Sequence, residues 1–402
     1  MLNLESFINS NIIHRQESLF EKDKLHNQKE LQYGISGKKV LVIGGAGSIG
    51  SSFIKALLSF EPISLVIVDV NENALTELTR DLRSAHNISI PLDYVTYPID
   101  YASKTFEKMF RARNGFDIVA NFSAHKHVRS EKDIFSVEAM LYNNVINAKK
   151  LLDLLSEIPP QVYFCVSTDK AANPVNIMGA SKRLMEDLIF SYSDKFEVKT
   201  ARFANVAFSN GSLPAGFLER ISKQQPLSAP NDVKRYFVSP KESGEICMLA
   251  CILGKNREIF FPKLEREQMM RFDTIAVKLL EEYGYKLLEC ADANEAFKAA
   301  EQLKSGSKLY PVLFSESNTS GEKIYEEFYV EGESVDLERF DSLGVVTDKP
   351  MIDRNKLDIL FDSLIDEFNK PDTKKENIVR IIADYLPNFK HIETGKSLDS
   401  KM

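Results

Sequence analysis

The chain has 402 residues, of which 44% are apolar and 27% are charged, and its net charge is −7. This composition is typical of a globular protein with one large or two modest domains, and the lack of a basic tract argues against a nucleic-acid partner. No apolar run approaches the ~18 residues that span a bilayer, and residues 1–17 lack the apolar stretch of a signal peptide, so we expect a cytoplasmic protein without membrane contact.

Residues 1–36 form a polar N-terminal extension. Its apolar residues recur at helical spacing, as Leu4, Phe7, Ile8 and Ile12 show. We therefore predict a helical arm that packs on the main domain or on a neighbouring subunit.

A glycine-rich loop follows the first predicted strand, residues 38–43, and precedes a helix that runs to about residue 60. In the string GGAGSIG, Gly44 permits a tight turn, Gly47 lets the backbone approach a pyrophosphate, and Gly50 lets helix and strand pack closely. Ser48 and Ile49 begin the helix, whose free N–H groups can bind phosphates. The pattern predicts a dinucleotide site.

The second predicted strand, residues 65–68, ends in Asp69, which lies nineteen residues after Gly50. A carboxylate at this place can accept hydrogen bonds from both ribose hydroxyls of the adenosine. It would repel a 2′-phosphate, so the sequence favours NAD over NADP.

Strands and helices continue to alternate, about six times by residue 205, which predicts an α/β fold with a doubly wound parallel (Rossmann) sheet. The third strand, residues 94–100, places Asp100 where it can touch adenine. The fourth, residues 117–121, leads into SAHKHV, where Ser123 and Lys126 are cofactor candidates.

His127, in the same loop, is a candidate for touching cofactor or sugar, and a buried structural histidine is the alternative. In the following helix we expect Asn144 to bridge backbone groups beneath the site.

The stretch STDKAANPVNIMGASK, residues 167–182, follows a buried strand at 162–166 and enters a helix. Open α/β sheets bind ligands at such strand ends. Thr168, Asp169 and Lys170 meet there, and Met178 and Lys182, four residues apart, share a helix face. The pattern predicts acid–base chemistry in one pocket.

The regular alternation ends after residue 206. We predict an NAD-binding domain over 37–261, with 206–240 contributing to a smaller substrate-binding lobe. The rest of that lobe is expected over 262–402, with a charged tail from about 370 to 402 that frays. The four cysteines show no paired metal spacing, so no metal is predicted; Cys247 and Cys251 are expected to pack in the core.

These motifs resemble the extended short-chain dehydrogenases/reductases, and more narrowly the UDP-N-acetylglucosamine 4,6-dehydratase family of polysaccharide biosynthesis. The resemblance runs from about residue 37 to 254 and rests on GGAGSIG, SAHKHV, STDKAANPVNIMGASK, RFANV and KRYF. It implies NAD, a UDP-N-acetylglucosamine-like substrate, and Asn205 and Arg235 near the nucleotide diphosphate. Many relatives carry an N-terminal membrane-spanning region, so this chain resembles a soluble form, which we expect to be a homo-oligomer.

The chemistry that the resemblance implies is a lyase reaction in three steps. The sugar is oxidised at C4, water is lost across C5 and C6, and the hydride returns to C6 to give a 4-keto-6-deoxy sugar. Lys170 is the candidate base for the C5 proton, if desolvation and the nearby Lys182 ammonium lower its pKa. Asp169 is the candidate acid for the departing C6 oxygen.

One position departs from the superfamily pattern, because Met178 stands where the usual Tyr-x-x-x-Lys pair has its tyrosine. A thioether cannot take up a proton at neutral pH. Some members of the dehydratase family also carry methionine there, so the resemblance favours an active enzyme. A nucleotide-sugar epimerase and a non-catalytic NAD-binding assembly protein remain alternatives, and the sequence leaves open UDP against GDP and retention against inversion at C5.

Overall fold

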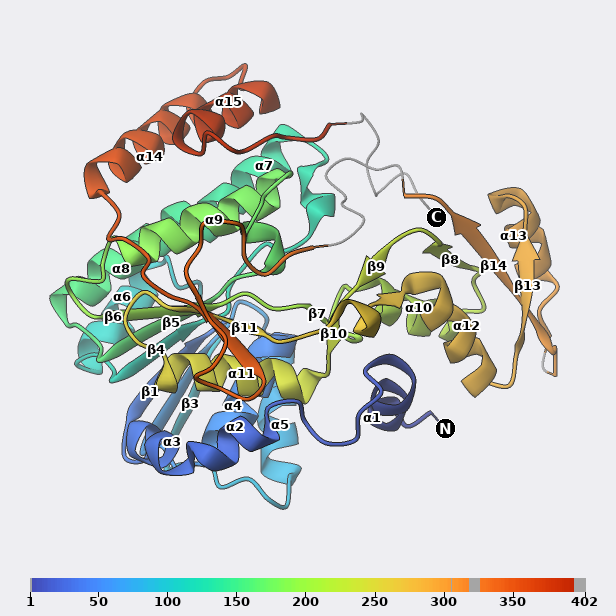
Figure 1. The fold of residues 1–402 in the computed structure, drawn as a ribbon, viewed down its shortest axis with the longest axis horizontal. Helices are drawn as coiled ribbons and strands as arrows, with labels where there is room; N and C mark the ends of the chain where they lie inside the picture. The colour runs from blue at the N-terminus through green and yellow to red at the C-terminus, as the bar shows by residue number, and fades with distance from the viewer. Residues whose placement is uncertain (1, 305, 318–325, 394–402) are drawn as a thin grey trace.

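The computed structural model describes residues 2–304, 306–317 and 326–393, and its centre is a nine-stranded sheet between layers of helices (Figure 1). From one edge to the other the strands are β15 (Val335–Asp336), β16 (Leu343–Val346), β11 (Ile259–Pro262), β6 (Glu197–Ala201), β5 (Val162–Val166), β4 (Ile118–Asn121), β1 (Lys39–Ile43), β2 (Ser64–Val68) and β3 (Asp93–Tyr97). Every pair from β11 to β3 is parallel, whereas β16 and β15 run antiparallel to their neighbours. The expected doubly wound sheet is confirmed.

The central strands form because their sequences are continuous apolar runs, as parallel strands covered on both faces require. Strand β2 is SLVIV and β5 is VYFCV, and every residue of both is buried. The helices α3 (Gln28–Ile35), α4 (Ser48–Leu58) and α11 (Pro240–Leu253) lie on one side of the sheet, and α7 (Ile134–Leu141), α8 (Asn147–Glu157) and α9 (Ile177–Phe190) lie on the other (Figure 1). Helices α5 (Glu72–Ser84) and α6 (Lys104–Ala112) flank the β1–β4 half.

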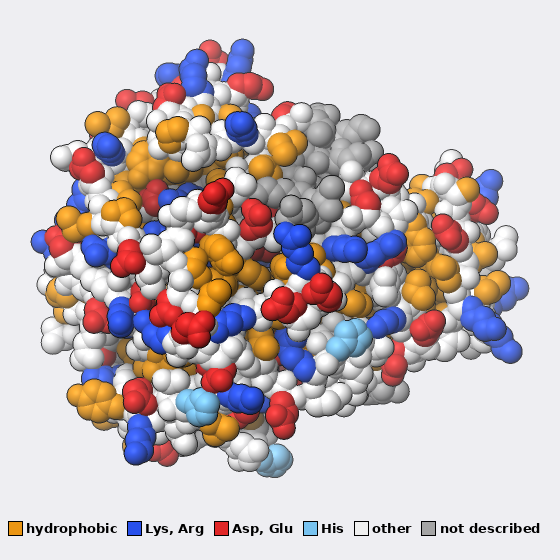
Figure 2. All heavy atoms as spheres, in the orientation of Figure 1, with side chains coloured by type: hydrophobic (Ala, Val, Ile, Leu, Met, Phe, Trp, Pro, Cys, Tyr) orange, Lys and Arg blue, Asp and Glu red, His pale blue; other side chains and the backbone are white. Residues whose placement is uncertain are grey.

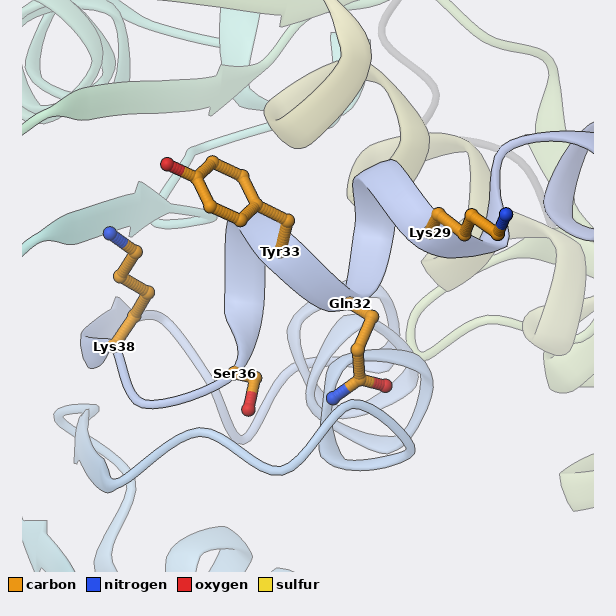
Figure 3. Close-up of a pocket in the computed structure, with 5 residues that line it drawn as sticks. All are labelled: Lys29, Gln32, Tyr33, Ser36 and Lys38. Atoms are coloured by element: carbon orange, nitrogen blue, oxygen red, sulfur yellow. The ribbon is translucent and has the colours of Figure 1, made fainter.

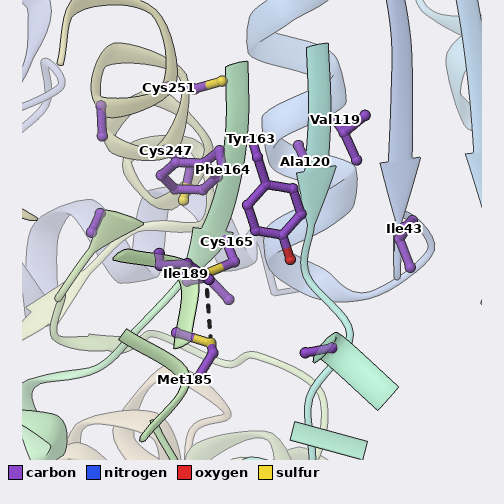
Figure 4. Packing of buried hydrophobic residues seen from close by; sticks show 14 of the residues in the cluster. Ile43, Val119, Ala120, Tyr163, Phe164, Cys165, Met185, Ile189, Cys247 and Cys251 are labelled. Carbon is purple, nitrogen blue, oxygen red and sulfur yellow. Dashed lines mark hydrogen bonds between the residues drawn. The ribbon is translucent and has the colours of Figure 1, made fainter. Parts of the chain in front are cut away.

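Sulfur-containing side chains fill part of the core beside β5 (Figure 4). All four cysteines are free and buried, so the prediction that Cys247 and Cys251 pack in the core is confirmed. The Cys165 thiol lies 3.6 Å from the Met185 sulfur. Burial among apolar neighbours raises the pKa of Cys165 to about 12, so this thiol is an inert packing group.

The predicted smaller lobe has its own parallel sheet, in the order β13 (Lys286–Cys290), β14 (Leu309–Ser315) and β8 (Leu227–Pro230). Helices α10 (Leu213–Ser222), α12 (Phe272–Glu282) and α13 (Ala293–Glu301) accompany it. A second hydrophobic cluster joins these elements to the N-terminal arm, where α1 (Leu4–Phe7) and the π-helical segment Ile8–Ile12 bury Phe7, Ile8 and Ile12. The arm then runs through α2 (Glu21–His26) to α3, which packs on the main domain.

Residues after 262 do not all belong to the smaller lobe, contrary to our expectation. Strands β15 and β16 extend the main sheet, and α14 (Arg354–Phe368) and α15 (Lys375–Tyr385) pack over α8 and α9 (Figure 1). The reason is that β11 would otherwise be an open edge, and the apolar strand Leu343–Val346 covers it. The expected fraying of 370–402 is wrong for α15, which buries Ile378 and Ile382; residues 394–402 lie outside the described part.

On the face seen in Figure 2, Lys and Arg side chains are interspersed with Asp and Glu. Among the described residues, no helix combines the length and apolarity needed to cross a bilayer.

A buried guanidinium ties the returning C-terminal segment to the main domain. Arg202 has no solvent exposure and donates to both oxygens of Glu186, at 2.8 and 2.7 Å, and to both oxygens of Glu333, at 2.9 and 3.2 Å. Although burial acts in the opposite direction, Arg202 and Lys349 lower the pKa of Glu333 from 4.5 to about 2. The stability that Glu333 contributes is therefore complete above about pH 4.5 and is lost as the pH falls toward 2.

We expect Arg202→Met to destabilise the protein strongly. The substitution leaves Glu186 and Glu333 buried without a countercharge, which typically costs about 3–5 kcal/mol. Denaturant unfolding measures this loss. Arg80→Met is the control, because the Arg80–Glu77 pair lies on the surface; this variant should unfold as the wild type does, and equal stability of the two variants would contradict the role assigned to Arg202.

Candidate active site

A cavity of about 1140 Å³ opens at the carboxyl ends of the main-sheet strands and extends to the smaller lobe. Strands β1 and β4 are neighbours in the sheet but not in the chain, so the cavity lies at the switch point where such sheets bind ligands. Its lining includes every predicted site residue except Asp169.

The glycine loop forms one wall. Gly44 has φ +71°, and a side chain there would approach the backbone nitrogen of Ser123 to 2.6 Å. A side chain at Gly50 would approach the Gly44 carbonyl oxygen to 2.4 Å. Both predicted glycine roles, the turn and the close packing, are therefore confirmed. Helix α4 begins without a side-chain cap, so the N–H groups of its first turn are available to an anion.

The predicted adenosine side is built from the ends of β2 and β3. The Asp69 carboxylate accepts hydrogen bonds from the N–H groups of Ala46 at 3.1 Å and Asn71 at 2.9 Å. These bonds fix its orientation beside the glycine loop. The Asp100 carboxylate is held by the N–H of Ala102 at 2.8 Å.

The loop after β4 contributes Ser123, Lys126 and His127 to the lining. His127 is exposed toward the cavity, so it is not a buried structural histidine. Burial in the cavity wall lowers the pKa of Lys126, and burial together with the charge of Lys126 lowers that of His127.

Asn144 supports this loop as predicted. Its side chain accepts from the N–H of His125 at 2.8 Å and donates to the His125 carbonyl at 2.9 Å. It also donates to the Ser181 hydroxyl at 3.0 Å, and thereby connects the loop to α9.

The turn at the end of β5 places Lys170 in the cavity and Asp169 behind it. Lys170 Nζ lies 2.9 Å from Asp169 Oδ1, which also accepts a hydrogen bond from the Thr168 hydroxyl at 2.8 Å. Asp169 is only 4% exposed. The two residues are adjacent as the sequence requires, but only the lysine and Thr168 face the cavity.

Helix α9 presents Met178 and Lys182 to the same cavity, both nearly fully buried. Lys182 Nζ donates to the Val166 carbonyl at 3.0 Å, and burial lowers its pKa to about 8. The backbone N–H of Met178 donates to Glu131 Oε1 at 2.9 Å, which secures the first turn of the helix.

The far end of the cavity lies in the smaller lobe, where Asn205 and Arg235 are lining residues. Arg235 belongs to the two-residue strand β9 (Lys234–Arg235), which pairs with β12 (Met270–Arg271). Arg220 on α10 lines the same end and was not predicted, because no motif distinguishes it from other surface arginines of amphipathic helices.

Glu326 is another lining residue that the sequence did not indicate. Its Oε1 lies 3.8 Å from Lys170 Nζ, and its side chain is 3% exposed. It is 156 positions from Lys170 in the chain and belongs to no motif, so only the tertiary structure brings the two together.

A second depression, on the surface of α3, has a different character. It is formed by Lys29, Gln32, Tyr33, Ser36 and Lys38, whose side chains spread apart (Figure 3). Tyr33 is almost wholly exposed, so this depression offers no converging polar groups.

Comparison with known families identifies the chain. Residues 40–347 match the model of the family described as polysaccharide biosynthesis protein. The chain belongs to this family. It is 31% identical over 358 residues to an uncharacterized membrane protein of Methanocaldococcus jannaschii, covering 86% of this chain and 96% of that protein. The chain spans about half the length of two other relatives, a probable polysaccharide biosynthesis protein of Bacillus subtilis (52%) and a capsular polysaccharide biosynthesis protein of Staphylococcus aureus (48%).

Relatives with named activities belong to two classes. An inverting UDP-N-acetylglucosamine 4,6-dehydratase of Campylobacter jejuni is 25% identical, covering 75% of this chain and 85% of that enzyme. A UDP-glucose 4-epimerase of Rickettsia typhi is also 25% identical, covering 62% of this chain and 72% of that enzyme.

Solved structures show the same fold. Pen from Bacillus thuringiensis has a TM-score of 0.63 and 21% identity, covering 80% of this chain and 90% of that one. The dTDP-glucose 4,6-dehydratase DesIV from Streptomyces venezuelae, solved with NAD and TYD bound, has a TM-score of 0.54 and 17% identity, covering 72% and 88%.

Proposed function

We propose that this protein is an NAD-dependent nucleotide-sugar 4,6-dehydratase that acts on UDP-N-acetylglucosamine or a closely related sugar nucleotide. The observation that carries the proposal is that Lys170, paired with Asp169 at the end of β5, faces the same cavity as the glycine loop. A proton-transferring group therefore lies within one cavity with a dinucleotide site. The C. jejuni relative bears the name of this activity.

The cofactor proposal rests on the fit of the residues present. The uncapped first turn of α4 suits a pyrophosphate, Asp69 suits the adenosine ribose, and Lys182 points its amine into the cavity beside the end of β5. DesIV, a structural relative, was solved with NAD. Bound at this place, NAD would supply reversible acceptance of a hydride from the sugar.

The substrate proposal rests on the smaller lobe. Arg220 on α10 and Arg235 on β9 bring two guanidinium groups to the cavity lining. Guanidinium groups suit the oxygens of a diphosphate, because their N–H donors match its geometry. Asn205, from strand β7 (Asn205–Val206), lines the same cavity.

Lys170 is proposed to remove the C5 proton, because its Nζ faces the cavity while Asp169 fixes its position from behind. Met178 packs against the sugar or cofactor and transfers no proton. Lys182 keeps its amine near the reacting centre, and its lowered pKa leaves part of the amine neutral at slightly alkaline pH.

A sugar-nucleotide 4-epimerase is the second candidate, favoured by the R. typhi relative. Epimerisation at C4 requires no base at C5, so the Asp169–Lys170 pair would have no catalytic role in that reaction. The mass of the product separates the two reactions, because a dehydratase removes one water and an epimerase yields an isomer.

The first prediction from this proposal concerns the cofactor. We expect the protein to bind NAD more tightly than NADP, because the Asp69 carboxylate would face the 2′-phosphate. Asp69→Asn removes the charge and keeps one of the two oxygens that accept hydrogen bonds from the Ala46 and Asn71 N–H groups, so it should narrow the difference in affinity between the two cofactors. Calorimetric titration of wild type and variant measures this, and tighter binding of NADP to the wild type would refute it.

The second prediction concerns Met178. Met178→Leu preserves the volume of the side chain, a change that cores usually tolerate for less than about 1.5 kcal/mol, so turnover should remain within a few-fold of wild type. Lys182→Met removes an amine from the reacting centre and should reduce turnover far more. Steady-state rates compare the two, and an equally deep loss in Met178→Leu would reveal a function of the thioether.

The third prediction tests the activity itself. Incubation with UDP-N-acetylglucosamine and NAD should yield a product lighter by one water, detected by mass spectrometry. Lys170→Met should lower turnover by ~10²–10⁴-fold, the usual effect of losing a general base, while NAD binding persists. Lys150→Met, on the exposed side of α8, is the control. An isomeric product would establish the epimerase instead.

A further inference from the structure

A second carboxylate beside Lys170 belongs to Glu326. Lys170 Nζ lies between two carboxylates, Asp169 Oδ1 at 2.9 Å and Glu326 Oε1 at 3.8 Å. Of these, Glu326 lines the cavity, and Asp169 does not. Loss of water from a 4-keto sugar requires both a base at C5 and an acid at the C6 oxygen. The acid must reach the sugar, which favours Glu326.

Asp169 is engaged elsewhere. Its Oδ1 accepts hydrogen bonds from the Thr168 hydroxyl and from Lys170, and its side chain does not line the cavity. An oxygen held in this way positions Lys170, but a substrate in the cavity meets Lys170 and Thr168 first. Asp169 is therefore a positioning residue for the lysine.

Glu326 is held in place by the network around Arg202. Burial alternates along residues 326–329, so Glu326 and Phe328 point inward while Glu327 and Tyr329 are exposed. The Phe328 carbonyl accepts a hydrogen bond from Arg202 Nη1 at 3.0 Å, and its ring packs on those of Tyr236 and Phe261. These contacts, two residues away, anchor the segment that carries Glu326.

We propose that Glu326 is the general acid that protonates the departing C6 hydroxyl, an assignment that rests on the proposed dehydratase function. Transfer of one proton from the Lys170 ammonium to the Glu326 carboxylate gives a neutral amine and a neutral acid together. Their 3.8 Å separation needs a small movement or one bridging water. The amine then takes the C5 proton, the acid gives its proton to the C6 oxygen, and the C6–O bond breaks to release water.

This step restores the Lys170–Glu326 ion pair. Lys170 later returns a proton to C5, and the proton released from the C4 hydroxyl in the oxidation replaces the one that left in water. No other reactant is required.

The test uses the full-length protein with NAD and UDP-N-acetylglucosamine in deuterated water. Glu326→Gln should lower dehydration by ~10²–10⁴-fold. Without the Glu326 carboxylate, the Lys170 ammonium must lose its proton to solvent, after which the amine can still remove and return the C5 proton, so the substrate recovered from this variant should gain one deuterium at C5. Lys170→Met should give neither dehydration nor deuterium, and Glu327→Gln, with its exposed neighbouring side chain, should behave as wild type.

Further variants and controls separate chemistry from folding. Glu326→Asp retains a proton donor and should recover part of the turnover that Glu326→Gln loses. Thermal unfolding and NAD titration should match the wild type in every Glu326 variant.

The inference is overturned if Glu326→Gln dehydrates at the wild-type rate, or if it loses deuterium exchange together with dehydration. If Asp169→Asn exchanges deuterium without dehydrating the sugar, and Glu326→Gln is fully active, Asp169 is the general acid. If the wild-type protein converts the sugar nucleotide to an isomer, or forms no product that has lost water, both the proposed function and this inference are overturned.

Discussion

The architecture of the site depends on one buried cation. Arg202, directly after β6, has no contact with solvent, and its guanidinium is shared between Glu186 on α9 and Glu333 in the returning C-terminal segment. Glu186 in turn accepts a hydrogen bond from the Ser167 hydroxyl at 2.6 Å. Ser167 precedes the Thr168-Asp169-Lys170 turn, and Phe328, held by the same guanidinium, follows Glu326. One side chain thereby connects the two segments that carry Lys170 and Glu326, whose charged groups lie 3.8 Å apart. The three charged side chains stabilise one another, because removing any one of them would leave the others buried and unpaired.

Close backbone approaches complete this arrangement. At Gly179 a side chain would come within 2.7 Å of the Lys170 carbonyl oxygen, so α9 can begin directly against the turn that carries the lysine. At Gly244 a side chain would come within 2.2 Å of the Ser52 carbonyl carbon, so α11 packs tightly on α4. Ser48 accepts a hydrogen bond from the N–H of Asn210 at 2.9 Å. The glycine loop is thus connected to the entrance of the smaller lobe, and both ends of the cavity share one rigid support.

Methionine at position 178 changes the electrostatics of the cavity. A phenol there would add a titratable group to the helix face that carries Lys182, whereas the thioether adds none; the Lys182 amine donates to the Val166 carbonyl and lies 3.7 Å from the Met185 sulfur. Burial then lowers the lysine pKa to about 8. The Lys170–Glu326 pair places an amine and a carboxylate together in the same cavity lining.

The sequence by itself determined the dinucleotide-binding half. Its signals are local: apolar runs that become parallel strands, glycines whose φ angle or lack of a side chain the turn requires, and Asp69 at a strand end. It also determined that Thr168, Asp169, Lys170, Met178 and Lys182 lie at one site, because strand-end position and helical spacing act over a few residues. Only the tertiary structure decided which of these side chains face the cavity, since Lys170 lines it whereas Asp169, which forms an ion pair with Lys170, does not. Only the tertiary structure showed that Glu326 lines the cavity. It also showed that residues after 326 lie with the main sheet and not in the predicted lobe. The physical reason is that residues far away in the chain pair with the edge of β11 and neutralise the buried charge of Arg202. A local sequence pattern does not indicate such distant partners.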